Sequence, residues 1–126
     1  MTSLKNKNAL ITGAGKGIGK AIAIALAKEG VNVILVSRTQ ADVDQLADET
    51  NDLGVKSLAL SADVSDINSI NKAVEKALAE FKHIDILING AGIASFGKFL
   101  ELEPAAFDKI IPVNLIAPYY ATRAVL

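Results

Sequence analysis

Short apolar runs alternate with amphipathic helical patterns along the chain, and this alternation restricts the fold more than any other feature of the sequence. The predicted strands are 9–12, 32–36, 55–61 and 84–88, and the predicted helices are 19–28, 40–53, 66–81 and a segment from about 104 onward. Strands that alternate with helices through short connections form a parallel sheet covered by helices on both faces. We therefore predict an α/β fold, a doubly wound parallel sheet with four strands in these residues.

Local patterns predict how three of these elements are placed. The run 32–36 is apolar and β-branched almost throughout, as expected for a strand that is buried on both faces. In the first helix, Ile22, Ala25 and Leu26 share one face, which we expect to be the buried face. Ser65 or Asp66 stands where the N-cap of the third helix is expected.

The composition fits a single globular domain. The 126 residues are 51% hydrophobic and 21% charged, which suffices for a core.

The net charge is −1 without a basic block, so nucleic acid is not an expected partner. The absence of cysteine excludes disulfides and thiolate metal sites, and no metal is expected. The first apolar run is too short for a signal or membrane span, so we expect a cytoplasmic protein without a membrane partner.

The helical pattern continues up to the last residue. The final stretch, ATRAVL, is still apolar-periodic, and no Gly, Pro or cap marks an end there. We therefore expect residues 1–126 to form one domain that is incomplete at its C-terminus.

Four glycines lie within seven positions, directly after the first strand and at the start of the first helix. The common dinucleotide pattern Gly-x-Gly-x-x-Gly does not fit, because Ile18 stands where the third glycine is needed. A phosphate loop ending in Gly-Lys-[Ser/Thr] fails at Ala21. Backbone amides at a helix N-terminus favour an anion, so we interpret the stretch as a phosphate site. The alternative is a glycine-rich turn without a ligand. The residues concerned are Thr12, Gly13, Ala14, Gly15, Lys16, Gly17, Ile18 and Gly19.

The segment Thr-Gly-x-x-x-Gly-Ile-Gly at 12–19 resembles the nucleotide loop of the short-chain dehydrogenase/reductases. Three further segments resemble this family in order: Asp63-Val64 after the third strand, Asn89-Gly90-Ala91-Gly92 after the fourth, and Asn114 in the last helical segment. The resemblance implies a Rossmann-type fold and a nicotinamide dinucleotide bound by these segments, with Asp63 at the adenine ring. Gly90 departs from the family, which has a second Asn there.

The end of the second strand bears on the choice of cofactor. Many dinucleotide folds place a carboxylate there for the adenosine ribose, but this chain has Ser37, Arg38 and Thr39. Arg38 offers a planar fork for a 2′-phosphate, and Lys16 adds a second positive charge. We therefore predict NADP(H) as the cofactor, bound in part by these residues. The alternative is that both cations are ordinary solvated surface groups.

Asn114 is the only member of the family's catalytic set in these residues. The resemblance implies a Ser and a Tyr-x-x-x-Lys pair further along, and it implies that Asn114 unwinds its helix so that a backbone carbonyl holds a water. Pro112 predicts a kink just before Asn114. Alternatively, Pro112 ends one helix and Asn114 caps the next. We interpret Tyr119 and Tyr120 as aromatics that pack in the helix interface, and His83 as a surface turn residue.

Among family members, the sequence most resembles the 3-oxoacyl-(acyl-carrier-protein) reductases of fatty acid metabolism. This predicts an NADP(H)-dependent oxidoreductase acting on a small or acyl-carrier-bound carbonyl substrate, in a homodimer or homotetramer. We expect residues 1–126 alone to be inactive. The alternatives are another short-chain alcohol, sugar or steroid dehydrogenase, and a dinucleotide-binding module without catalysis. A flavodoxin-like protein is disfavoured, because Thr12 stands where acidic residues would be needed.

Overall fold

The computed structural model describes residues 3–126 and contains one parallel sheet. Its four strands lie in the order β3-β2-β1-β4. Their bounds are Asn8–Thr12 for β1, Asn32–Ser37 for β2, Ser57–Ser61 for β3 and Ile86–Asn89 for β4. In register, Leu10 of β1 lies between Ile34 of β2 and Leu87 of β4. The predicted doubly wound α/β fold is confirmed.

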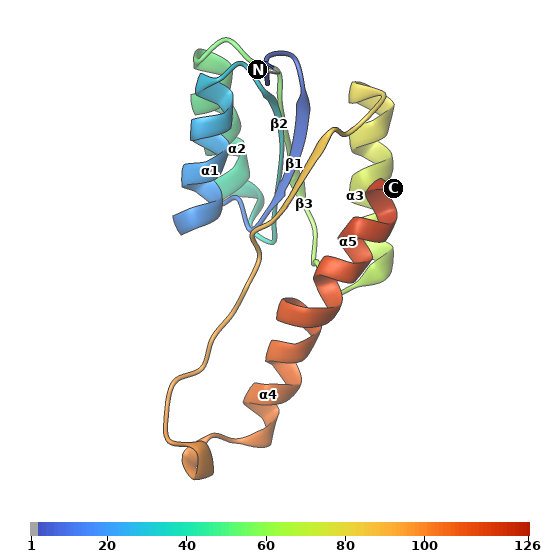
Figure 1. Cartoon of the computed structure of the whole chain (residues 1–126). Helices are drawn as coiled ribbons and strands as arrows, with labels where there is room; N and C mark the ends of the chain where they lie inside the picture. The colour runs from blue at the N-terminus through green and yellow to red at the C-terminus, as the bar shows by residue number, and fades with distance from the viewer. Residues whose placement is uncertain (1–2) are drawn as a thin grey trace.

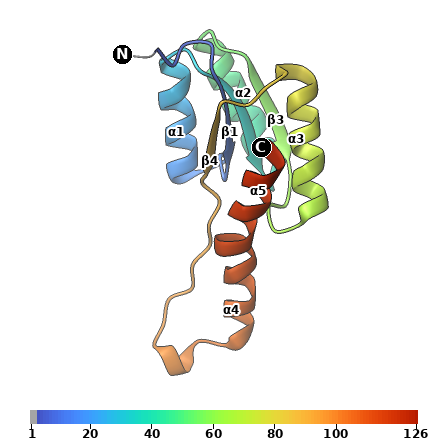
Figure 2. The ribbon, with the colours of Figure 1, turned by 45° about the vertical axis from the view of Figure 1, so that its right-hand side comes forward.

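Helices cover both faces of the sheet (Figure 1). Helices α1 (Gly17–Lys28) and α2 (Gln40–Asp52) lie on one face, and α3 (Ile67–Phe81) and α5 (Ala117–Val125) lie on the other. The remaining helical segments are η1 (Phe99–Glu101), α4 (Pro104–Ile111) and η2 (Pro112–Ile116). In Figure 2, α4 and the loop before it project beyond the carboxyl ends of the strands.

Two apolar layers hold the helices on the sheet, because side chains alternate between the faces along each strand. Ala9 and Ile11 of β1 pack into the layer under α1 and α2, whereas Leu10 packs into the layer under α3 and α5. The apolar residues of β2 are fully buried, from Val33 to Val36. This confirms the prediction that the strand is covered on both faces.

Helix α1 buries a different face from the one predicted. Its buried residues are Gly19, Ala23 and Ala27, while Ala25 is exposed. Small residues on the inner face allow α1 to approach the sheet closely, and Ile22 and Leu26 are only half-buried beside this contact. The prediction for Ala25 was wrong because it gave weight to apolar periodicity alone and did not include how close the helix lies to the strands.

The N-terminus of α3 follows one of the two predicted caps. The Asp66 side chain accepts hydrogen bonds from the amides of Asn68 and Ser69. This is the standard N-cap arrangement, since it satisfies two amides that have no partner within the helix. Asp66, and not Ser65, is therefore the cap.

Buried amide groups join the amino ends of the strands. Asn8 is 5% exposed, and its Nδ2 donates to the carbonyl oxygens of Phe81 (3.3 Å) and His83 (3.0 Å). Its Oδ1 accepts from Nδ2 of Asn32 at 3.0 Å. The side chain of His83 is largely exposed, at 3.3 Å from Asp85, which confirms the predicted surface position.

Candidate functional site

An open groove of about 940 Å³ runs along the carboxyl ends of the strands. It lies between the β1–α1 turn, the β2–α2 and β3–α3 loops, the loop after β4, and the segment where α4 meets η2. In a doubly wound sheet this edge is where ligands bind. The sequence-predicted residues on its wall are Gly13, Gly15, Lys16, Gly17, Ile18, Gly19, Ser37, Arg38, Thr39, Asp63, Val64, Gly90, Ala91 and Gly92.

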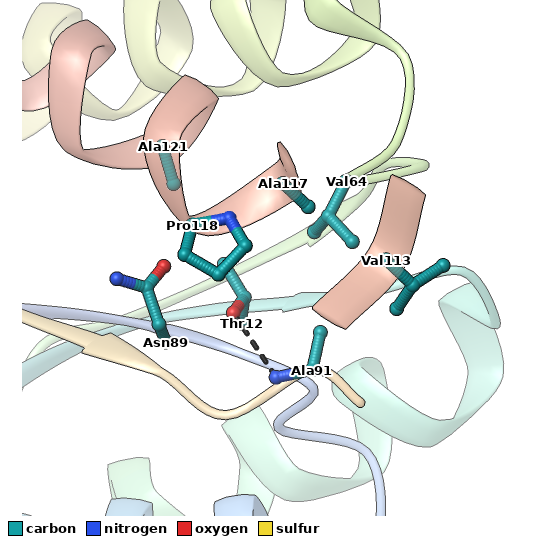
Figure 3. Close-up of a pocket in the computed structure, with 8 residues that line it drawn as sticks. All are labelled: Thr12, Val64, Asn89, Ala91, Val113, Ala117, Pro118 and Ala121. Atoms are coloured by element: carbon teal, nitrogen blue, oxygen red, sulfur yellow. Dashed lines mark hydrogen bonds between the residues drawn. The ribbon is translucent and has the colours of Figure 1, made fainter. Parts of the chain in front are cut away.

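Three residues predicted to bind the cofactor, Thr12, Ala14 and Asn89, do not line this groove. Ala14 is fully buried in the core. Thr12 and Asn89 line a separate pocket against Ala117 and Pro118 that is too small for a water molecule (Figure 3). There the Thr12 hydroxyl accepts a hydrogen bond from the amide of Ala91 at 3.3 Å. Thr12 therefore fixes the loop after β4, and its side chain does not form part of the groove wall.

Glycine is required where the ends of β1 and β4 meet. A Cβ on Gly13 would lie 2.6 Å from both the amide nitrogen of Ala91 and the carbonyl oxygen of Gly90. A Cβ on Gly90 would lie 2.5 Å from the carbonyl oxygen of Thr12. Gly90, which departs from the family motif, thus preserves the close backbone approach.

Gly17 differs, because nothing lies within 4 Å of the Cβ position there although φ is +55°. It is the first residue of α1, and it faces the open groove. The N-cap residue Lys16 makes no side-chain capping bond, and the first turn contains no acidic residue. Amides at such a helix start have no intrahelical partner. This region therefore fits an anionic group such as a diphosphate, through its amides and the helix dipole.

The β2–α2 loop supplies a cation at the same groove. Arg38 is exposed, and its carbonyl oxygen accepts a hydrogen bond from Ser61 at 3.1 Å. The Ser37 hydroxyl accepts from the amide of Thr39 at 3.2 Å. None of the ion pairs found among residues 3–126 uses Arg38 or Lys16. Both charges can therefore meet a bound anion.

Asp63 is held by the serine that follows it. Its Oδ1 accepts hydrogen bonds from the hydroxyl of Ser65 at 2.7 Å and from the amide of Ser65 at 3.0 Å. These bonds lower the pKa of the Asp63 carboxyl, chiefly through the Ser65 hydroxyl, and the positive charge of Arg38 adds to the effect. Asp63 is thus a fixed carboxylate near Arg38, while Val64 beside it is mostly buried.

Asn114 lies in η2, a π-helical segment that links α4 to α5. The amide of Ala117 donates to the carbonyl oxygen of Pro112, which is the wider spacing of a π turn. The backbone at Pro112 stays helical, with φ −58° and ψ −38°, so the predicted disturbance is a local π turn within one continuous helical path. The alternative that Asn114 caps the next helix is wrong, because no side chain caps α5.

The Asn114 side chain makes two hydrogen bonds to the backbone of Ile93. Its Oδ1 accepts from the Ile93 amide at 2.9 Å, and its Nδ2 donates to the Ile93 carbonyl oxygen at 2.8 Å. This pair fixes the loop after β4 against η2. Asn114 therefore positions the groove wall with its side chain.

The two tyrosines do not have the same role. Tyr120 packs against the cluster of Val64, Ile70 and Ala117. Tyr119 is 58% exposed and accepts a hydrogen bond from Arg123 at 3.1 Å. The prediction that both are packing aromatics is therefore wrong for Tyr119, because only one of two adjacent helical positions can face the sheet.

The groove is also lined by residues that were not predicted as site residues, namely Asp42, Ala62, Ser65, Ile93, Asp108, Lys109, Pro112 and Val113. Asp42, Ser65 and Ile93 follow predicted residues by one to three positions, so their proximity along the chain was an available signal. Val113 lies beside Asn114 but reaches the groove only because η2 crosses it. No group of three His, Asp or Glu side chains in the described part of the chain is arranged to hold a metal ion.

The parallel sheet in the order 3-2-1-4, with a glycine turn after β1 and a groove at the carboxyl edge, defines a Rossmann-type nucleotide-binding fold. A family model for short chain dehydrogenases matches residues 7–126. The chain belongs to this family. Its members are oxidoreductases that bind a nicotinamide dinucleotide.

Relatives and solved structures agree with this assignment. Oxidoreductase UcpA of Salmonella typhimurium is 40% identical over all of this chain and 48% of its own length. L-rhamnose 1-dehydrogenase (NADP(+)) of Thermoplasma acidophilum is 34% identical over 99% of this chain and 50% of its own. A 3-ketoacyl-(acyl-carrier-protein) reductase of Brucella melitensis, complexed with NADH, is 41% identical with a TM-score of 0.92, covering 98% of this chain and 50% of that one. The chain thus spans about half the length of the relatives it matches.

Proposed function

We propose that residues 1–126 are the NADP(H)-binding half of a carbonyl reductase. The observation that carries the proposal is the uncapped start of α1 at the open groove, with Gly17 facing open space and Arg38 on the same wall. When bound, the nicotinamide supplies the hydride, and this chain binds and orients it. The amides of the glycine turn hold the diphosphate, and Arg38 and Lys16 hold the 2′-phosphate.

The preference for NADP(H) rests on the charges at the end of β2. Arg38 occupies this position, and Ser37 and Thr39 beside it are neutral. The relatives differ in the cofactor that is named for them. The Brucella reductase is complexed with NADH, and the Thermoplasma enzyme is named for NADP(+). An arginine fork discriminates by forming charge-assisted bonds to a phosphate that NAD(H) lacks.

A 3-oxoacyl thioester is the proposed substrate, supported by the 41% identity to a 3-ketoacyl-(acyl-carrier-protein) reductase. Residues 1–126 alone are expected to be inactive. They contain no Tyr-x-x-x-Lys pair, because Tyr119 is followed four residues later by Arg123 and Tyr120 by Ala124. Without a proton donor, the developing alkoxide is not stabilised.

The proposed assembly is a cytoplasmic homodimer or homotetramer. Large apolar side chains are exposed on the projecting segment and on the helices that follow, among them Phe107 of α4 and Leu115 of η2. Exposed apolar side chains of this kind indicate a surface that packs either in a core or against another subunit. Within residues 3–126, no helix is long and apolar enough to cross a membrane.

The test compares residues 1–126 with the complete protein that contains them. Both forms are expected to bind NADPH, measured by its fluorescence, but only the complete protein should oxidise NADPH with an acetoacetyl thioester. Turnover by residues 1–126 alone would show that the catalytic residues are misplaced. A complete protein that binds NADPH but reduces no carbonyl would favour the second candidate, a dinucleotide-binding module, which the missing Tyr-x-x-x-Lys pair supports.

A further inference from the structure

A carboxylate lies against the glycine turn at the end of the groove that Arg38 lines. Asp42 is in the first turn of α2, and its side chain occupies the space beside Gly15. A Cβ on Gly15 would lie 3.0 Å from the Cβ of Asp42, 3.4 Å from its Oδ2 and 2.9 Å from the Ser37 hydroxyl. Gly15 therefore makes room for this acidic side chain.

No hydrogen-bond or ion-pair partner within the described residues accounts for the position of the Asp42 carboxylate. None of the side-chain hydrogen bonds or ion pairs found among residues 3–126 includes it, although its amide donates to Thr39 at 3.2 Å. The residue is only half-buried, and the α2 dipole gives a modest favourable term. Asp42 and Arg38 line the same groove but do not neutralise each other in an ion pair.

We propose that Asp42 is a specificity-determining residue that opposes the 2′-phosphate and so limits the preference for NADP(H). This inference rests on the proposed function. A 2′-phosphate carries a charge of about −1.5 to −2 at neutral pH, by analogy with other phosphomonoesters. Arg38 and Asp42 line the same groove, so the charge of Asp42 acts against a phosphate bound by Arg38 wherever the two lie within a Debye length of about 8 Å. The uncharged 2′-hydroxyl of NAD(H) is not repelled, and it can donate a hydrogen bond to a carboxylate.

The test uses Asp42→Asn, which keeps the shape beside Gly15 and removes the charge. The matched control is Asp48→Asn, an equal charge change on the exposed face of the same helix. Binding of 2′,5′-ADP and of 5′-AMP to the complete protein is measured by calorimetry, together with NADPH and NADH. Asp42→Asn is expected to bind 2′,5′-ADP and NADPH about threefold to tenfold more tightly, with 5′-AMP and NADH unchanged or weaker.

Salt dependence adds a second readout. The gain in NADPH affinity of Asp42→Asn should shrink as ionic strength rises, because screening weakens the repulsion in the wild type. If Asp42→Asn does not fold, Asp42→Ser, which keeps a residue suited to a helix N-terminus, is expected to show the same selective gain.

Two results separate the inference from the proposed function. A protein that binds NADPH, but whose Asp42→Asn variant matches Asp48→Asn or shifts all four ligands equally, overturns the role of Asp42 and leaves the proposed function intact. A wild type that binds neither NADPH nor NADH overturns both.

Discussion

Asn114 and Ile93 form a reciprocal pair of hydrogen bonds across 21 residues of sequence, at 2.9 Å and 2.8 Å. The Asn114 side chain makes the two hydrogen bonds that a residue of a neighbouring β-strand would make. It accepts from the amide of Ile93 and donates to its carbonyl oxygen. The pair joins η2 to the loop after β4, which has no regular secondary structure of its own next to Ile93. It therefore holds one wall of the groove.

Replacing Asn114 with Ala should loosen this wall. Loss of two hydrogen bonds at an accessible site corresponds to about 1–1.5 kcal/mol, so amide exchange at Ile93 should become roughly tenfold faster. Hydrogen-exchange mass spectrometry or NMR measures this directly. Asn71→Ala, at an exposed position of α3, is the control. Unchanged exchange at Ile93 would show that η2 is held in place by packing alone.

Replacing Arg38 with Asp should shift the cofactor preference toward NAD(H). Loss of a charge-assisted hydrogen bond of about 1.5–3 kcal/mol would weaken NADPH binding tenfold to a hundredfold. Dissociation constants for NADPH and NADH, measured by fluorescence, check this prediction. Arg123→Asp, on α5 and absent from the groove wall, serves as the charge control. Equal constants for NADPH and NADH in the wild type would contradict it.

Replacing Gly17 with Val should abolish dinucleotide binding and leave the protein folded. The added side chain meets no protein atom within 4 Å but fills space over the first turn of α1, where the diphosphate is proposed to bind. Gly54→Val is the matched control, because Gly54 also has a positive φ (+94°) and open space but lies away from the groove. Both variants carry a backbone strain of roughly 1–2 kcal/mol. Normal NADPH binding by folded Gly17→Val would refute the assignment.

Replacing Asn8 with Leu should destabilise the sheet without a direct effect on the groove. The change leaves the carbonyl oxygens of Phe81 and His83 without the donor they have in the native chain. Burying such groups without a partner lowers the free energy of unfolding by about 2–3 kcal/mol. Urea unfolding followed by circular dichroism provides the measurement. A loss below about 0.5 kcal/mol would mean that solvent replaces these bonds easily.

Replacing Ser65 with Ala should raise the pKa of Asp63 toward its ordinary value of 3.8, because the largest cause of its lowering is the bond to the Ser65 hydroxyl. A carboxyl with a depressed pKa in the folded state stabilises the protein above its unfolded-state pKa and loses this contribution as pH falls through the folded value. The variant should therefore lose less stability than the wild type when the pH falls below about 4. An NMR titration of Asp63 tests this, and an unchanged pKa would exclude the hydroxyl as the cause.

The sequence by itself determined the features that depend on neighbouring residues. The order of strands and helices follows from local apolar periodicity, and the backbone needs of a single turn restricted the N-cap of α3 to Ser65 or Asp66. Pro112 predicted a disturbed helix just before Asn114, because proline cannot donate an amide hydrogen. These signals depend on residues that are only a few positions apart, so they can be recognised in the amino-acid sequence.

The tertiary structure alone decided which distant segments meet. Apolar periodicity did not show that α1 buries Gly19, Ala23 and Ala27, because that face is chosen by how closely the helix packs on the sheet. The partner of Asn114 and the position of Asp42 over Gly15 were equally absent from local patterns. Such contacts depend on sheet order and crossover geometry, which bring the ends of separate strands to one edge.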